Sequence, residues 1–188
     1  MILIILGVIA AIVMPIVIAF FWIIGTYNTL QKAVQDIKEQ WSNILTEYQR
    51  RADLLINLAS TVKSFKKHEK ETLTEVIKAR AQGITGTKPQ QMAKLKGFEG
   101  ALSKLMVLIE KYPDLKANEQ HNTLMTEVRM TEDRINVSRT DYNAIVGDYN
   151  TYVKTFPNSL VANHFRFKLE KFFELVDKSA DKAPRLEL

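Results

Sequence analysis

Charged residues inside an otherwise apolar helical pattern are the first candidates for chemistry in this chain. Arg51 occupies a position where the pattern expects an apolar side chain, and Asp53 follows two residues later. A guanidinium buried without a partner costs several kcal/mol, so we expect an acidic side chain from another helix to meet it. The candidate members of this polar layer are Arg51, Asp53, Asn57, Glu132, Arg134 and Arg139.

This polar layer has two interpretations. In the first, it fixes the register between the helix that carries Arg51 and the helix that carries Glu132. In the second, it binds a ligand or a protein partner. The register interpretation is preferred, because no cleft can be located from the residue pattern.

The residue types that usually carry catalysis form no recognisable motif. Cysteine is absent, which excludes disulfides, thiolate nucleophiles and thiolate metal ligands. The histidines His68, His121 and His164 are far apart, and none lies in a metal-binding spacing. Phosphate-binding loops, dinucleotide fingerprints and nucleophile elbows are also missing. We therefore expect no enzymatic activity, no metal and no cofactor, and a hydrolase is the least favoured class.

An apolar N-terminal stretch is the first element that must position these residues. Residues 2–24 hold no charged side chain and would form about 34 Å of helix, enough for a bilayer core of roughly 30 Å. Phe20, Phe21, Trp22 and Tyr27 gather at its end, as aromatic residues do at a membrane interface. A cleaved signal peptide is the alternative, but no basic residue precedes the run and no small-residue cleavage site follows it. We expect a retained anchor over residues 1–25.

Apolar residues recur every three and four positions through the rest of the chain, which indicates long coiled-coil-like helices. The apolar pattern changes phase near His68. Two prolines, Pro113 and Pro157, each end a helix. Thr87 and Gln90 are spaced as a capping box. The predicted fold is all-α: an N-terminal transmembrane helix that continues into an up-down four-helix bundle. Its expected body covers residues 26–182, with helices at about 26–82, 89–112, 117–156 and 158–178 and an extended tail at 183–188.

The first expected helix has a longer apolar stripe than its neighbour can cover. Its aqueous part of about 56 residues would be roughly 84 Å long, against roughly 35 Å for the second helix. Either the helix kinks near His68 or its membrane-proximal rows pack against something else, because water rarely faces a large apolar stripe. We expect self-association through this stripe, formed by Tyr27, Leu30, Val34, Ile37, Trp41, Ile44 and Tyr48.

Positive charge is concentrated in residues 63–111, which we call the basic block. It holds 11 basic and 5 acidic residues, a net charge of +6, whereas the whole chain carries +5. Such a block is most often a solvated pair of helix faces, and it can also attract an acidic protein or anionic lipid headgroups. Nucleic acid is not an expected partner, because aromatic residues do not interleave with the lysines.

The nine residues from Arg50 to Leu58 closely resemble the LemA family of bacterial membrane proteins. Further matches occur in order along the chain: Tyr27-Asn28, Trp41-Ser42, His68-Glu69, residues 112–118, the Tyr-Asn pairs at 142–143 and 149–150, and Phe156-Pro157. The chain departs from the family at Ile56, where proline is usual, and at Arg166, where glycine is usual between two phenylalanines. The resemblance implies a one-pass membrane protein with a helical-bundle body and no established enzymatic activity. Some members are linked to envelope stress and membrane proteases, and others to specialised bacterial membranes.

We predict a non-enzymatic, membrane-anchored helical scaffold or adaptor of the bacterial envelope that self-associates and binds protein partners. The alternative is a membrane-remodelling or anionic-lipid-binding module that uses the basic block. The resemblance suggests a membrane protein or a membrane protease as the partner. The resemblance implies a protein of the bacterial inner membrane. Lys32 and Lys38 follow the anchor closely, so the positive-inside rule favours a cytoplasmic body.

Overall fold

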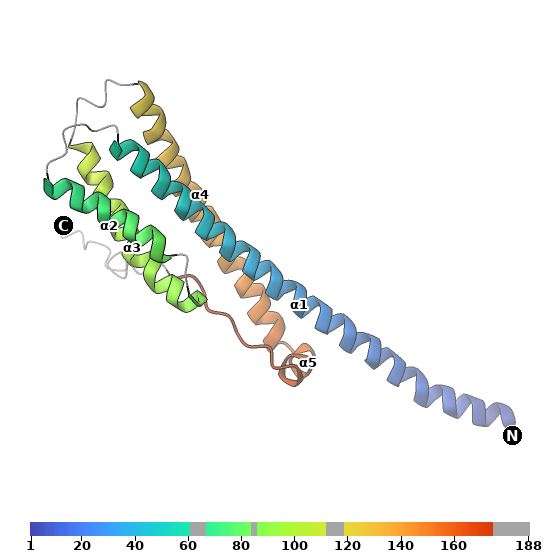
Figure 1. Ribbon diagram of the computed structural model, residues 1–188. Coiled ribbons are helices and arrows are strands. Elements are labelled where there is room, and N and C mark those ends of the chain that lie inside the picture. The colour runs from blue at the N-terminus through green and yellow to red at the C-terminus, as the bar shows by residue number, and fades with distance from the viewer. Residues whose placement is uncertain (61–66, 84–85, 112–118, 175–188) are drawn as a thin grey trace, which may run out of the picture. The chain divides into compact units, whose positions relative to one another are not determined.

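The structure, a computed structural model, describes residues 1–60, 67–83, 86–111 and 119–174 (Figure 1). Its helices are α1 (Ile2–Ser60), α2 (Lys67–Gly83), α3 (Lys88–Glu110), α4 (Glu119–Lys154) and α5 (Asn158–His164). Every regular element in these described ranges is a helix, which confirms the predicted all-α class. The expected tail at 183–188 lies outside them.

The chain divides into two compact units, and each unit joins two separate parts of the sequence. The first unit contains Met1–Trp41 and Asp141–Phe172. The second unit contains Ser42–Thr140 and Phe173–Leu188. Both α1 and α4 therefore contribute residues to both units.

The first unit begins with the apolar part of α1. One stretch of this helix is long and apolar enough to cross a membrane, and none of that stretch is buried within the chain. Pro15 lies inside the helix without ending it, as membrane-spanning helices tolerate. Burial starts after the apolar run, at Thr26 and Leu30. The same helix thus passes from a fully exposed apolar surface to a packed one.

Aromatic side chains hold α1 to the rest of the first unit. The ring centroids of Trp41 on α1 and Tyr142 on α4 are 5.6 Å apart. Tyr27 contacts Phe165 and Phe167, with centroid distances of 4.8 and 5.8 Å. Each such pair stabilises a fold by about 0.5–1.5 kcal/mol beyond the area it buries.

The predicted helix at 158–178 is wrong for residues 165–174, and residues 175–178 lie outside the described chain. The helix α5 has 7 residues, and the described chain that follows, residues 165–174, forms no regular element. Arg166 has a φ of 59°, in the left-handed region that commonly follows the last residue of a helix. Aromatic content and helical spacing alone therefore overestimated this helix.

Side chains of α4 replace helical hydrogen bonds in the segment 167–172. The Asn150 side chain donates to the Glu170 carbonyl and accepts from the Glu170 N–H, both at 2.9 Å. The hydroxyls of Tyr142 and Tyr149 donate to backbone carbonyls of the same segment, at 3.1 and 2.8 Å. Because its backbone groups find partners on α4, the segment needs no helix to satisfy them.

The second unit is a four-helix bundle built from residues 42–60 of α1, from α2 and α3, and from residues 119–140 of α4. The helix α2 packs against α3, and the Tyr48 ring of α1 lies 6.0 Å from the Phe98 ring of α3. Within this unit the chain direction alternates from helix to helix (Figure 1). All four helices contribute fully buried apolar side chains, among them Leu55, Leu58, Val76, Leu102, Leu105, Ile109 and Ile135.

The predicted single helix at 26–82 is two helices in the structure. The helix α1 ends at Ser60 and α2 begins at Lys67, while residues 61–66 lie outside the described chain. In the second unit α2 runs back beside α1 (Figure 1). The phase change in the apolar pattern near His68 lies in the first turn of α2, which supplies one of the four helices of the second unit.

The start of α3 follows the predicted capping box. The Thr87 N–H donates to the Gln90 side-chain oxygen at 2.9 Å, and the Thr87 hydroxyl lies 3.1 Å from the same oxygen. Pro89 occupies the first turn, where its missing N–H leaves no hydrogen bond unmade. Local sequence therefore determines where this helix begins.

Candidate functional site

Arg51 and Glu132 meet between α1 and α4 in the second unit. Arg51 is 8% exposed, and its Nη2 donates to Glu132 Oε2 at 3.3 Å. Glu132 itself remains largely exposed, so the buried cation reaches an anion at the protein surface. The Arg51 Nε atom is buried and has no hydrogen-bond partner in the described chain, which leaves one donor open.

Arg139 forms a second cluster with residues from α1 and α3. Its Nη2 donates to the Tyr48 hydroxyl and to the Glu99 carboxylate. Its guanidinium also lies over the rings of Tyr48 and Phe173, 5.3 and 4.9 Å from their centroids. A planar, delocalised cation suits such stacking better than an ammonium group. Burial lowers the pKa of Arg139 to about 10, so the side chain remains charged at neutral pH.

Glu99 on α3 was not singled out from the sequence. It follows the buried Leu95 by four residues and precedes the buried Leu102 by three, which places it on the same helix row. That spacing was the available signal. Burial raises the pKa of Glu99, the charge of Arg51 lowers it, and the charge of Glu132 raises it.

Asp53 belongs to another pair, and two predicted members lie apart from the clusters. Arg80 of α2 places its Nη2 at 2.8 and 2.9 Å from the two carboxylate oxygens of Asp53. Asn57 and Arg134 are exposed on α1 and α4. The structure therefore brings Arg51 to Glu132, and it joins Asp53 and Arg139 to partners on α2 and α3.

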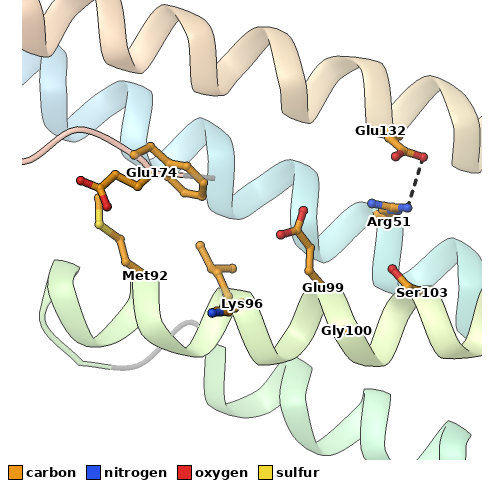
Figure 2. Close-up of a pocket in the computed structure, with 10 residues that line it drawn as sticks. Arg51, Met92, Lys96, Glu99, Gly100, Ser103, Glu132 and Glu174 are labelled. Carbon is orange, nitrogen blue, oxygen red and sulfur yellow. Dashed lines mark hydrogen bonds and ion pairs between the residues drawn. The ribbon is translucent and has the colours of Figure 1, made fainter. Parts of the chain in front are cut away.

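A cavity of about 510 Å³ lies beside these charges in the second unit (Figure 2). Figure 2 shows Arg51 joined to Glu132, with Glu99 rising from α3 beside them. The lining combines two cations with three carboxylates and is completed by small and apolar residues: Arg51, Met92, Leu95, Lys96, Glu99, Gly100, Ser103, Glu132, Phe173 and Glu174.

Metal chemistry has no candidate in the described ranges, where no three residues among His, Cys, Asp and Glu are placed to hold an ion. Two charged groups of the lining, Arg51 and Glu132, pair with each other, and Glu99 pairs with Arg139. Arrangements of this kind can fix helix register and can hold a polar group. These residues can therefore serve as a structural polar layer, and the cavity beside them has room for a small polar ligand.

The chain itself buries most of the expected self-association stripe, contrary to the sequence argument. Leu30, Ile37, Ile44 and Tyr48 are at most 1% exposed, and Trp41 is 6% exposed. Tyr27 and Val34 keep intermediate exposure. The sequence argument compared the first helix only with the second, whereas α4, with 36 residues or about 54 Å, also covers it.

Comparison with known proteins finds one matching family model and several relatives. The LemA family model matches residues 40–188, a range that takes in the polar layer and the segment bound to α4. Protein LemA of Metamycoplasma hominis is 29% identical over 155 residues, covering 80% of this chain and 69% of that protein. Magnetosome protein MamQ 2 of Paramagnetospirillum magneticum is 28% identical over 185 residues, covering 84% and 67%. Magnetosome protein MamQ of Magnetospirillum gryphiswaldense is 26% identical with the same coverage.

Proposed function

Because this chain belongs to the LemA family, we propose that it is a non-enzymatic, membrane-anchored helical scaffold or adaptor. The observation that carries the proposal is the continuity of α1. This helix runs for 59 residues, from a stretch able to cross a membrane into the packed core of a helical bundle. A single stiff element therefore ties the body to the membrane. A function that depends on holding a surface near a membrane suits this arrangement.

The basic block is the proposed contact surface for a protein partner. Among its described residues, Lys78, Lys94, Lys96 and Lys104 are exposed. Lys104 lies 3.8 Å from Glu75, and both side chains remain mostly in solvent, so this cation is only weakly engaged. The proposed partner is a membrane protein or membrane protease with an acidic surface. The magnetosome proteins among the relatives agree with a role at a specialised membrane.

Photo-crosslinking in intact cells tests the adaptor role. A photoreactive amino acid replaces the exposed Lys78 of α2 in the full chain, and an identical substitution at the exposed Asn136 of α4 is the control. We expect a defined protein adduct from position 78 that is absent from position 136, identified by mass spectrometry. Identical background from both positions, or adducts to lipid alone, would overturn the proposal.

The alternative function, binding to anionic lipid, uses the same exposed lysines. Proteoliposomes carrying the full chain would then tether anionic acceptor vesicles, which light scattering detects, and salt would reverse the tethering. Replacing Lys78, Lys94, Lys96 and Lys104 by glutamine would abolish it, while neutral acceptor vesicles serve as the control. If neither salt nor these substitutions changed the tethering, the basic block would be excluded as the lipid-binding surface.

Self-association and topology complete the proposal. Self-association now requires a surface other than the stripe from Tyr27 to Tyr48, because the chain buries most of that stripe. We place the body in the cytoplasm at the inner membrane, supported by Lys32 and Lys38, which are exposed just after the apolar run. The chain has no cysteine, so Lys38→Cys gives a unique thiol. A membrane-impermeant maleimide should label it only after spheroplasts are lysed.

A further inference from the structure

Apolar side chains on and beside α5 are exposed in the first unit. We call Phe156, Leu160, His164 and Phe165 the α5 patch. Phe156 is 75%, Leu160 59% and Phe165 46% exposed. Neighbouring residues of α5, Val161 and Ala162, are buried and hold the helix to its unit. One side of α5 is therefore packed, while another presents large apolar groups outward.

Contacts within the first unit place the α5 patch beside the end of the membrane-spanning stretch. Leu160, His164 and Phe165 share a cavity of about 340 Å³ with Trp22 and Ile23, and Val161 completes its lining. The Phe165 ring also packs 4.8 Å from the ring of Tyr27. Figure 1 shows α5 beside α1 at this point of the helix.

The height of these contacts along α1 determines what surrounds the patch. Trp22 and Tyr27 are separated by about 7 Å along the helix axis, at the aromatic end of the apolar run. Aromatic residues at this position mark the boundary between hydrocarbon and headgroups. Since α5 contacts α1 at this boundary, its exposed apolar groups lie where the membrane surface must be.

We propose that the α5 patch inserts into the interface of the same membrane that α1 spans, as a second attachment of the first unit. The occupant is lipid: acyl chains meet Phe156, Leu160 and Phe165, and they also enter the cavity beside Trp22. The exposed Arg166 and Lys168 follow the patch and reach the phosphate groups. An apolar face flanked by basic residues is the pattern of interfacial membrane attachment.

This second attachment has a mechanical consequence. A body held by one helix can tilt relative to the membrane, whereas a second contact through α5 limits the tilt of the first unit. The argument rests on the continuity of the patch with the membrane-spanning stretch. It is independent of the adaptor role and of the basic block.

Site-directed spin labelling in lipid nanodiscs tests the proposal on the full chain. Because the sequence lacks cysteine, Leu160→Cys, Ala144→Cys and Phe21→Cys each give one labelling site, and all three lie in the first unit. Ala144 is exposed on α4 and serves as the aqueous control, while Phe21 reports the membrane interface at the end of the apolar run. The measured quantity is the accessibility of each label to oxygen relative to a water-soluble nickel complex.

We expect the Leu160 label to give an oxygen-to-nickel ratio several-fold above that of the Ala144 label, approaching the Phe21 value. A Leu160 ratio equal to the Ala144 ratio would overturn the proposal. Spin–spin broadening at Leu160 that disappears on dilution with unlabelled protein would show a second copy on the patch, which also overturns it. The labelled side chain points outward, so circular dichroism should report unchanged helicity in all three variants.

Discussion

Arg80 Nη2 and Asp53 Oδ1 are 2.8 Å apart, although 27 residues separate them in the chain. In one continuous helix the two residues would be about 40 Å apart. The contact therefore exists only because α2 folds back beside α1. The apolar pattern predicts one long helix here, whereas the contact joins two antiparallel helices of a bundle.

The contribution of this pair can be measured with a double-mutant cycle of Asp53→Asn and Arg80→Gln. Both side chains are more than one-third exposed, so we expect a coupling of about 0.2–1 kcal/mol, measured by urea unfolding in detergent. The matched control is the Glu75 and Lys104 pair, whose 3.8 Å separation and greater exposure predict a smaller coupling. An equal coupling energy in the two pairs would contradict the expectation that the closer and less exposed Asp53–Arg80 pair contributes more to stability.

Local patterns carried most of what could be predicted about this fold. The all-α class and the start of α3 follow from helical spacing and from Thr87, Pro89 and Gln90, which act within one turn. The partner of Arg51 could also be anticipated, because a cation on an apolar row requires an anion. The sequence does not show which helix covers a stripe, since that depends on the direction the chain takes after Ser60.

The segment after α5 illustrates the second limit of prediction. Its aromatic residues fall at helical spacing, yet hydrogen bonds from Tyr142, Tyr149 and Asn150 hold its backbone outside a helix. These partners lie on α4, 19 to 29 residues earlier in the chain. Competition between a local helix and distant side chains cannot be resolved from spacing alone. Glu99, in contrast, lies on the row of α3 that holds Leu95 and Leu102, and helical spacing does reveal this row.

Asn150→Asp should weaken the attachment of the segment at 167–172. The amide of Asn150 both donates and accepts, whereas a carboxylate only accepts, so the Glu170 carbonyl would lose its donor. We expect a loss of about 1–3 kcal/mol in unfolding free energy and faster hydrogen exchange at the Glu170 amide. Asn136→Asp, at an exposed position on α4, is the control and should change neither quantity.

Arg166→Gly should stabilise the protein. Arg166 has a φ of 59°, which costs a side-chain-bearing residue about 1–2 kcal/mol, whereas glycine adopts it freely. Greater entropy of the unfolded glycine chain offsets part of this gain, so we expect a net increase of about 0.5–1 kcal/mol, seen as a higher melting temperature. Lys168→Gly is the control, since no positive φ occurs there and glycine should destabilise it. A lower melting temperature for Arg166→Gly would contradict this account.

Trp41→Ala separates internal packing from self-association. Trp41 is buried against Tyr142, so the substitution should lower the unfolding free energy by about 3–5 kcal/mol. It should leave the oligomeric state in detergent unchanged, as measured by analytical ultracentrifugation, because the Trp41 side chain packs inside its own chain. Val137→Ala, at an exposed position, should alter stability by less than about 0.5 kcal/mol. A change of oligomeric state with intact stability would restore the stripe as an interface.

Glu99 predicts a specific pH dependence of stability. Burial raises the pKa of Glu99 above its ordinary value of 4.5, so the folded protein binds this proton more tightly than the unfolded chain does. Its contribution to stability is fully present below pH 4.5 and is lost as the pH rises through the raised pKa. Glu99→Gln cannot titrate, and it therefore isolates this effect. The unfolding free energy of the wild type minus that of Glu99→Gln should fall with rising pH, measured by denaturant titration. A difference that rises with pH would show that attraction to Arg139 outweighs the cost of burial.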